Sequence, residues 1–382
     1  MKILKSGAAP SAIVSLSQKI GRLSRESGRE YLRLERGIPA VRPIDLQSVA
    51  PFLPFNDPQM QSYPPSTGRE SLKTAINDAY FGGKARPDRI VITPGGSMGL
   101  DIAFQVLDAE TFFLPEFHWG TYRQILKTRG RAWDFYASLG ELADQPKKFF
   151  GTAVVICDPG NPLGSLEPEG RVIETARRLA EAGVPVLIDC PYRRLFLDPA
   201  DGFYRALTPL ESVVIIESFS KSLGLSGLRV GFVHASDPDF IAEFSLRLAL
   251  PTNGVDNIAQ AFVEHLLAHP EGMSLAGAYR AVTTDHTARN LSYLKTRGLL
   301  ASEFYKEAEA LGIFAAVNRS PEELLESRIG SISLASFTEK NKGRAEGRAR
   351  VNIAVPHETF VSFFDAHLKK HPSSGTPPER RE

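Results

Sequence analysis

The 382-residue sequence predicts an α/β fold with a large domain, built on a mostly parallel seven-stranded sheet flanked by helices, and a smaller α+β domain. Apolar runs typical of buried strands alternate with segments of helical periodicity between residues 89 and 233. Such alternation indicates a sheet covered by helices on both faces. After Pro251 the pattern is almost wholly helical through Leu311, and a mixed segment follows, which we interpret as the second domain.

The elements follow in order along the chain. Apolar residues from Ile13 to Leu23 suit one face of a first helix, and five prolines between Pro51 and Pro65 exclude regular structure after it. The clearest helices of the large domain are residues 70–80, 98–106 and 170–181. The predicted strands of the sheet are residues 89–93, 112–114, 132–136, 153–157, 184–188, 213–216 and 230–233.

The second domain has strand candidates at residues 330–334 and 349–354. We expect residues 1–45 to join this small domain, residues 46–275 to form the large domain and residues 276–370 to form the small one. Residues 371–382 are polar and rich in proline, so we expect a disordered tail.

Composition excludes several classes of function. A formal net charge of +1 provides no field of one sign that would attract nucleic acid or an anionic membrane, and no apolar run is long enough to span a bilayer. No secretory signal is evident, and two cysteines, Cys157 and Cys190, do not indicate a disulfide framework, so we expect a cytoplasmic protein. The eight histidines have no ligand-like spacing, so a metal site is not indicated.

Polar clusters directly follow four of the predicted strands, at residues 95–97, 158–162, 189–192 and 218–221. In an open α/β sheet, ligands bind beyond the carboxyl ends of the strands. The four clusters therefore predict a binding site at one edge of the sheet.

Lys221 lies in the last of these clusters, after an apolar strand. A lysine in this position can be desolvated, which lowers its pKa and makes the neutral amine available for a Schiff base. Ser218, Ser220 and Arg229 have the chemistry to hold a phosphate group beside it. The alternative for this segment alone is a polar loop with a solvated lysine.

Together the motifs resemble the fold-type I enzymes that use pyridoxal 5'-phosphate (PLP), of the class I/II aminotransferase family, from about Gly37 to Ala354. The resemblance implies that Lys221 holds the aldehyde of PLP and moves a proton between the substrate Cα and the cofactor. It implies that Asp189 lies beside the pyridine nitrogen, and that Tyr192 and Asn161 donate to the phenolic oxygen.

The resemblance also assigns a phosphate cup and a stacking residue. Gly95, Gly96 and Ser97 match the cup, which Ser218, Ser220 and Arg229 would complete, and Trp119 matches the aromatic residue that stacks on the pyridine ring. Phe117 is the alternative for stacking, and Tyr122 is equally compatible with the core. Tyr63 matches a tyrosine that reaches the phosphate of the neighbouring subunit, which implies a homodimer with shared active sites.

For the substrate, Arg350 matches the arginine that binds the α-carboxylate, and Gly37 and Asn161 match further contacts. We interpret Arg344 and Arg348 as a solvated charge run. Residues 333–338 depart from the Pro-Gly-x-x-Phe-like stretch that is usual in the family, Gly160 and Pro191 also depart from its pattern, and we identify no second arginine for a dicarboxylic substrate.

The function that this resemblance implies is transfer of an amino group between an L-amino acid and a 2-oxo acid. A PLP-dependent lyase, decarboxylase or cyclase on the same scaffold is the alternative, because fold does not settle the chemistry. A non-catalytic PLP-fold regulator is less favoured, because no basic helix-turn-helix segment precedes residue 37.

Overall fold

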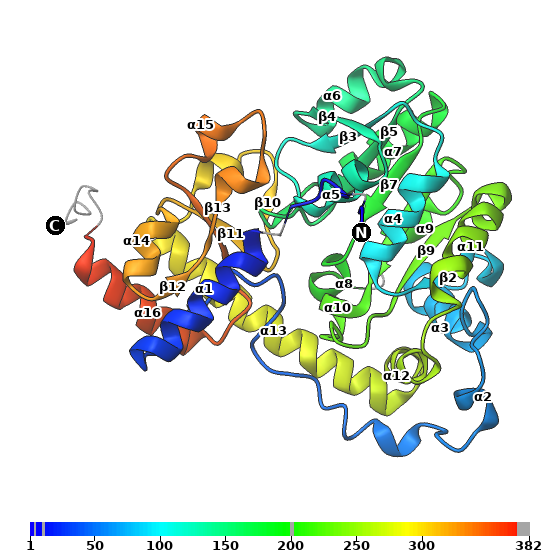
Figure 1. The fold of residues 1–382 in the computed structure, drawn as a ribbon, viewed down its shortest axis with the longest axis horizontal. Coiled ribbons are helices and arrows are strands. Elements are labelled where there is room, and N and C mark those ends of the chain that lie inside the picture. Colours follow the sequence, from blue (N-terminus) through cyan, green and yellow to red (C-terminus); the bar gives the residue numbers. More distant parts are fainter. Residues whose placement is uncertain (4, 10–11, 199–201, 373–382) are drawn as a thin grey trace.

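A seven-stranded sheet forms the centre of the larger lobe (Figure 1). The computed structural model describes residues 1–3, 5–9, 12–198 and 202–372. Neighbouring strands are parallel except at β9, which is antiparallel to both β2 and β8. In spatial order the strands are β2 (Ile90–Thr93), β9 (Gly231–Ala235), β8 (Val213–Ser218), β7 (Val186–Asp189), β5 (Ala153–Cys157), β3 (Thr111–Pro115) and β4 (Ala132–Tyr136). The predicted mostly parallel seven-stranded sheet is confirmed.

The central strands are apolar on both faces because helices cover both. Every residue of β7 and β8 is buried. One face packs against α3 (Glu70–Phe81), α6 (Leu139–Asp144), α7 (Glu169–Glu181), α9 (Phe203–Leu207) and α12 (Asn257–Ala268). The other face packs against α4 (Gly96–Val106), α5 (Thr121–Thr128) and α11 (Pro238–Thr252). Short helices α2 (Pro58–Gln61), α8 (Arg193–Phe196) and α10 (Phe219–Ser222) complete this lobe.

The smaller lobe is built on a three-stranded antiparallel sheet. Its strands are β11 (Phe314–Val317), β14 (Ala349–Asn352) and β13 (Ile332–Ser333) in spatial order. Three helices belong to this part of the chain: α14 (Pro321–Glu326), α15 (Lys342–Ala345) and α16 (His357–Lys370). A separate apolar core fills this lobe.

Two of the connections between the lobes are a long helix and a pair of short strands. The 27-residue helix α13 (Pro270–Thr296) runs from one lobe to the other (Figure 1), with Ala276 in the core of the larger lobe and Leu294 in that of the smaller. Strand β6 (Ser165–Leu166) pairs with β10 (Glu309–Ala310). The predicted domain boundary between residues 275 and 276 falls inside α13 and stays a prediction.

The N-terminal helix lies on the smaller lobe, whereas the residues before it reach the larger lobe, where the backbone N–H of Ala9 donates to Gln124 of α5. Helix α1 (Ala12–Ser27) packs beside β12 (Ile329–Gly330), which pairs in parallel with β1 (Leu32–Arg33). In Figure 1 this blue helix crosses the orange and red elements of the C-terminal part.

Two local predictions for the second domain were wrong. The helical pattern does not continue to Leu311, because α13 ends at Thr296 and Gly298 follows with a φ of +63°. The predicted strand at residues 330–334 is two short strands, β12 and β13, that belong to different sheets. Of the predicted tail at residues 371–382, residues 373–382 lie outside the described residues. Within the described part of the chain, no helix combines the length and apolar character needed to cross a membrane.

Candidate active site

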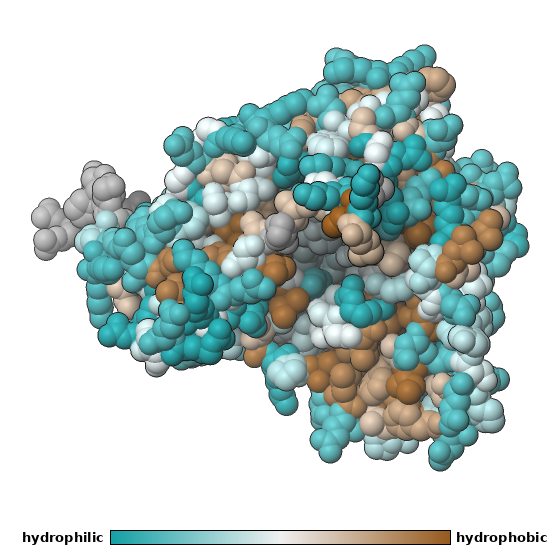
Figure 2. Space-filling view, viewed as in Figure 1, coloured by the Kyte–Doolittle hydropathy of each residue, from teal (hydrophilic) through white to brown (hydrophobic). Residues whose placement is uncertain are grey.

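A cavity of about 270 Å³ lies where β5, β7 and β8 end. Figure 2 shows the molecular surface hollowed near the middle of the face, between the lobes. Most of the predicted site residues line this cavity: Gly37, Gly96, Ser97, Trp119, Asn161, Asp189, Tyr192, Ser218, Ser220, Lys221, Arg229 and Arg350. The expectation that the polar clusters meet at one edge of the sheet is therefore met.

Lys221 projects into this cavity from α10, one turn after β8 ends. Ser218 caps this short helix, because its hydroxyl accepts a hydrogen bond from the backbone N–H of Ser220. Burial lowers the pKa of the Lys221 ammonium to about 8, and the guanidinium groups of Arg229 and Arg350 lower the pKa in the same direction. A substantial fraction of this amine is therefore neutral near pH 8.

Asp189 ends β7 and is 4% exposed. Burial raises the pKa of its carboxyl group to about 7, and a hydrogen bond donated by the hydroxyl of Tyr122 opposes that rise. Tyr122 comes from α5 and its side chain is fully buried. From the sequence, Tyr122 was equally compatible with a position in the core. In the structure its hydroxyl donates to the carboxylate of Asp189, a predicted site residue.

A hydrogen-bonded chain crosses the floor of the cavity. Asn161 Nδ2 donates to the hydroxyl of Tyr192 at 3.2 Å, and Asn161 Oδ1 accepts from Arg350 Nη1 at 3.2 Å. The orientation of the amide is thus fixed by one acceptor and one donor. Burial raises the pKa of Tyr192, so its hydroxyl remains protonated across the neutral range.

Arg350 lies on β14 and its side chain is fully buried. The guanidinium carbon stands 4.2 Å from the ring centre of Phe314 and 4.8 Å from that of Phe337. Its Nε is buried without a hydrogen-bond partner among the described residues. A buried guanidinium with unused donors is suited to bind a carboxylate. Arg348, in contrast, pairs with Glu303 at 2.6 Å.

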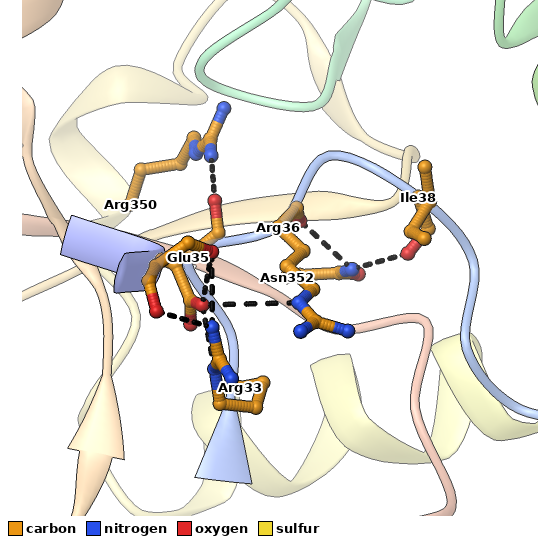
Figure 3. Close-up of polar contacts among 7 residues, drawn as sticks. Arg33, Glu35, Arg36, Ile38, Arg350 and Asn352 are labelled. Atoms are coloured by element: carbon orange, nitrogen blue, oxygen red, sulfur yellow. Dashed lines mark hydrogen bonds and ion pairs between the residues drawn. The ribbon is translucent and has the colours of Figure 1, made fainter. Parts of the chain in front are cut away.

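The segment that follows β1 holds Arg350 from the N-terminal side (Figure 3). Arg350 Nη2 donates to the backbone carbonyl of Glu35 at 2.7 Å. The buried Glu35 carboxylate accepts from Arg33 Nε at 2.7 Å and from the hydroxyl of Ser17, on α1, at 2.8 Å. Asn352 donates to the carbonyls of Arg36 and Ile38, and so fixes the backbone on both sides of Gly37.

The N-terminus of α4 and the loop after α10 form one cluster. Gly95, with a φ of +79°, precedes α4, whose first N–H groups have no partner within the helix. A Cβ at Gly95 would lie 2.6 Å from Arg229 Nη2. Arg229 in turn donates to the hydroxyl of Ser220 at 3.4 Å. Helix N–H groups, serine hydroxyls and a guanidinium together suit a phosphate group.

Trp119 and Phe117 are separated by the structure. Trp119 lines the cavity and meets Tyr122 edge to face at 5.6 Å. Phe117 lines a different cavity and packs edge to face on Phe304 at 5.3 Å, with the Arg344 guanidinium 5.9 Å from its ring centre. The geometry therefore favours Trp119 as the stacking residue and places Arg344 away from the site.

Two predicted residues do not line the cavity. Gly95 lies directly behind it, against Arg229. Tyr63 is 85% exposed and lies in a surface hollow beside Asn257. A role for Tyr63 in the site of its own subunit is therefore not supported, whereas a role toward another subunit stays a prediction.

Sequence reasoning missed some of the lining residues. Ile13 and Ile38 reach the cavity from the N-terminal segment, and Cys157 and Leu100 line it from the larger lobe. The carboxylate of Glu35 was also missed. The sequence did contain a signal for Cys157, because it ends a predicted strand directly before a polar cluster. The structure pairs Cys157 with Asp189 across the sheet.

The residues present fit PLP. The buried amine of Lys221 suits an aldehyde, the carboxylate of Asp189 suits a protonated ring nitrogen, and the donor pair Tyr192 and Asn161 suits a ring oxygen. Because Arg229 lies close to Gly95, its guanidinium and the N–H groups at the start of α4 can bind the same phosphate group.

The sequence model of the family described as "Aminotransferase class I and II" matches residues 55–354. The chain belongs to this family. Over 272 residues this chain is 29% identical to nicotianamine aminotransferase A of Hordeum vulgare, an alignment that covers 63% of this chain and 57% of that protein. It is 34% identical to histidinol-phosphate aminotransferase of Thermococcus kodakarensis over 137 residues, which are 36% of this chain and 37% of the relative.

The chain spans about half the length, or less, of the curated relatives that it matches. The fold is similar over a much longer stretch. Aspartate aminotransferase from Thermus thermophilus, solved with maleate, superposes with a TM-score of 0.79 at 20% identity and covers 97% of this chain and 100% of that one. That likeness establishes the same fold.

Proposed function

We propose that this protein is a PLP-dependent aminotransferase that moves an amino group between an L-amino acid and a 2-oxo acid. The observation that carries this proposal is the meeting of Lys221, Asp189, Asn161 and Arg350 in one cavity between the two lobes. The cavity thus offers an amine, a carboxyl group and a guanidinium that can serve a single reaction centre. Membership in the aminotransferase family supports the same activity.

When bound, PLP would supply an electron sink that stabilises negative charge at the substrate Cα. Asp189 would hold the ring nitrogen in its protonated state, and the hydroxyl of Tyr192 and the amide of Asn161 would bind the ring oxygen. Lys221 is the residue that moves protons in this proposal. Its depressed pKa, about 8, would let Nζ accept a proton from the substrate Cα and donate it on the cofactor side, which is the transfer that transamination requires.

Arg350 would position the substrate through its α-carboxylate. The donors that remain after the bonds to Asn161 and Glu35 are available for a carboxylate, and a planar guanidinium can bind it in a bidentate manner. Stacking on Phe314 and Phe337 holds the guanidinium plane in one orientation. This restricts the rotation of the substrate and keeps its Cα within reach of Lys221.

A lyase, decarboxylase or cyclase that uses the same residues is the second candidate, because the amine and the electron sink serve all these reactions. The experiment that separates the candidates is incubation of the PLP-loaded protein with single L-amino acids. Formation of the matching 2-oxo acid, without release of carbon dioxide, supports transamination. Lys221→Ala should abolish 2-oxo acid formation, and turnover by this variant without an added amine would contradict the assignment.

We also propose that the active unit is a cytoplasmic homodimer. Large apolar side chains are exposed on the larger lobe, namely Phe52, Phe55, Tyr63, Leu250 and Ile258. The segments of two of them contact α12, because Asn257 donates to the carbonyl of Ser62 and the Phe52 ring stacks on His265. Brown residues gather near α12 in Figure 2, in the same region of the lobe. Contiguous exposed apolar surface is typical of an interface, and sedimentation equilibrium measures whether the dimer forms. The cytoplasmic location rests on two cysteines that form no disulfide.

A further inference from the structure

A second cavity of about 400 Å³ adjoins the candidate active site. Ile13 and Trp119 line both cavities, so they form a common wall. Ile332 and Phe337 also line the second cavity, which we call the side-chain cavity. Its position relative to Arg350 decides what part of a substrate can enter it.

Two residues of the side-chain cavity are direct neighbours of Arg350. Ile332 on β13 is paired with Arg350 on β14 across the antiparallel sheet, so both side chains lie on the same face. Phe337 lies under the guanidinium, with its ring centre 4.8 Å from the guanidinium carbon. A substrate whose α-carboxylate is held by Arg350 therefore has its side chain within reach of this cavity.

The positively charged groups around both cavities already have a counter-charge or a role in the proposed function. In the first cavity, Lys221, Arg229 and Arg350 have roles toward the cofactor and the α-carboxylate in the proposed function. In the side-chain cavity, Arg123 Nη1 donates to Glu339, whose other oxygen accepts from the indole of Trp133 at 3.4 Å, while Arg123 Nε is buried without a hydrogen-bond partner among the described residues. A distal carboxylate of a substrate would have to share Arg123 with Glu339, whose negative charge already offsets that of the guanidinium.

The remaining wall is apolar where it faces the shared boundary. Ile332 and Phe337 are 3% exposed, and Ile13 and Trp119 are partly buried. Burying an apolar substrate group against such a wall is favourable, whereas a charge placed there without a partner is costly.

We propose, resting on the proposed aminotransferase function, that the side-chain cavity selects amino donors with bulky, uncharged apolar side chains, such as aromatic or large aliphatic ones. The group that Arg350 binds is common to all donors, so the discrimination falls to the wall of Ile13, Ile332 and Phe337. A large apolar side chain that packs against this wall gains binding energy. A methyl side chain is too short to contact the wall and does not gain it.

The test compares kcat/KM of the PLP-loaded protein for L-phenylalanine, L-alanine and L-aspartate. We expect L-phenylalanine to exceed both others by about tenfold or more, the range that hydrophobic pockets provide. Calorimetry with unreactive acids gives a second measurement: 3-phenylpropanoate should bind more tightly than succinate. A preference for L-aspartate and succinate would overturn the substrate class and leave the aminotransferase activity standing. Failure of every donor to yield a 2-oxo acid would instead overturn the proposed function.

Two variants at neighbouring positions on α1 test whether the preference for L-phenylalanine arises in the side-chain cavity. Ile13→Asp should lower kcat/KM for L-phenylalanine by about tenfold more than that for L-alanine, because the methyl group of L-alanine does not reach the side-chain cavity. Val14→Asp is the matched control, since Val14 is 51% exposed and does not line the side-chain cavity. An equal loss for both donors in Ile13→Asp, or the same loss in Val14→Asp, would overturn the assignment of this cavity.

Discussion

Arg350 donates a hydrogen bond of 2.7 Å from Nη2 to the backbone carbonyl of Glu35. This bond joins β14 to the segment between β1 and Gly37, and the Glu35 carboxylate joins that segment to α1 through Ser17. A Cβ at Gly330 would lie 2.6 Å from Glu35 Oε2, so glycine at that position leaves room for the buried carboxylate. The orientation of the guanidinium thus depends on how the N-terminal segment packs.

Arg350→Lys should raise KM for an amino donor by about 10- to 100-fold, because the ammonium cannot make the bidentate bonds of a guanidinium. Steady-state kinetics with a good donor measures this. Arg348→Lys is the matched control, because Arg348 pairs with Glu303 and should leave KM unchanged. An unchanged KM in Arg350→Lys would exclude it as the carboxylate-binding residue.

The rate at which the PLP-free protein captures pyridoxal should rise as pH increases through about 8, because the neutral amine of Lys221 is the reacting form. Arg229→Gln removes a positive neighbour that disfavours the ammonium, so the pKa of Lys221 should rise and the midpoint should move to higher pH. Pyridoxal carries no phosphate, so the lost phosphate contact does not affect the comparison. A midpoint that moves to lower pH, or a profile that is flat between about pH 6 and 9, would contradict the assignment.

Gly95→Ala should weaken PLP binding by about tenfold, because the new Cβ would displace the Arg229 guanidinium from the phosphate cup. Gly130→Ala is the control, since Gly130 also has a positive φ, +64°, and nothing lies within 4 Å of its added Cβ. Each variant carries a backbone strain of about 1–3 kcal/mol, because a positive φ disfavours a side chain, and Gly95, with a ψ of 167°, lies in a region that is essentially restricted to glycine. Equilibrium titration with PLP should therefore show weaker binding for Gly95→Ala alone, and equal affinities would argue against the cup.

Mixing Tyr63→Ala with Lys221→Ala should restore activity beyond the sum of the separate variants. If Tyr63 serves the neighbouring subunit, each mixed dimer contains one site with both native residues. Random exchange of subunits in equal amounts then gives about a quarter of the normal number of sites. Activity that stays at the sum of the two variants, in a sample shown to exchange subunits, would exclude a shared site.

The large sheet was predictable because its central strands are buried on both faces. The uninterrupted apolar run before Ser218 and the polar cluster after it both follow from local sequence, and they placed Lys221 at the correct edge. Asp189 and Asn161 follow strands in the same way. Local patterns are sufficient where a strand end also fixes the position of the side chain.

The smaller lobe was less predictable because its elements are short and pair over long distances in sequence. Strand β11 spans four residues and was not predicted, since its partner β14 lies far along the chain. Ile13 was assigned only to a helix face, because nothing local shows that α1 reaches the cavity. Tyr122 had the spacing of a core residue, and the bond from its hydroxyl to Asp189 appears only when α5 packs on the sheet.

The visible absorption spectrum of the purified protein with PLP tests the central claim most directly. We predict a visible band from the cofactor held on Lys221, which falls when a donor amino acid is added and returns when a 2-oxo acid follows. The donor should appear as its 2-oxo acid in amounts that match the fall of the band. No visible band at saturating PLP would contradict the assignment of Lys221, and a donor that loses carbon dioxide instead would contradict transamination.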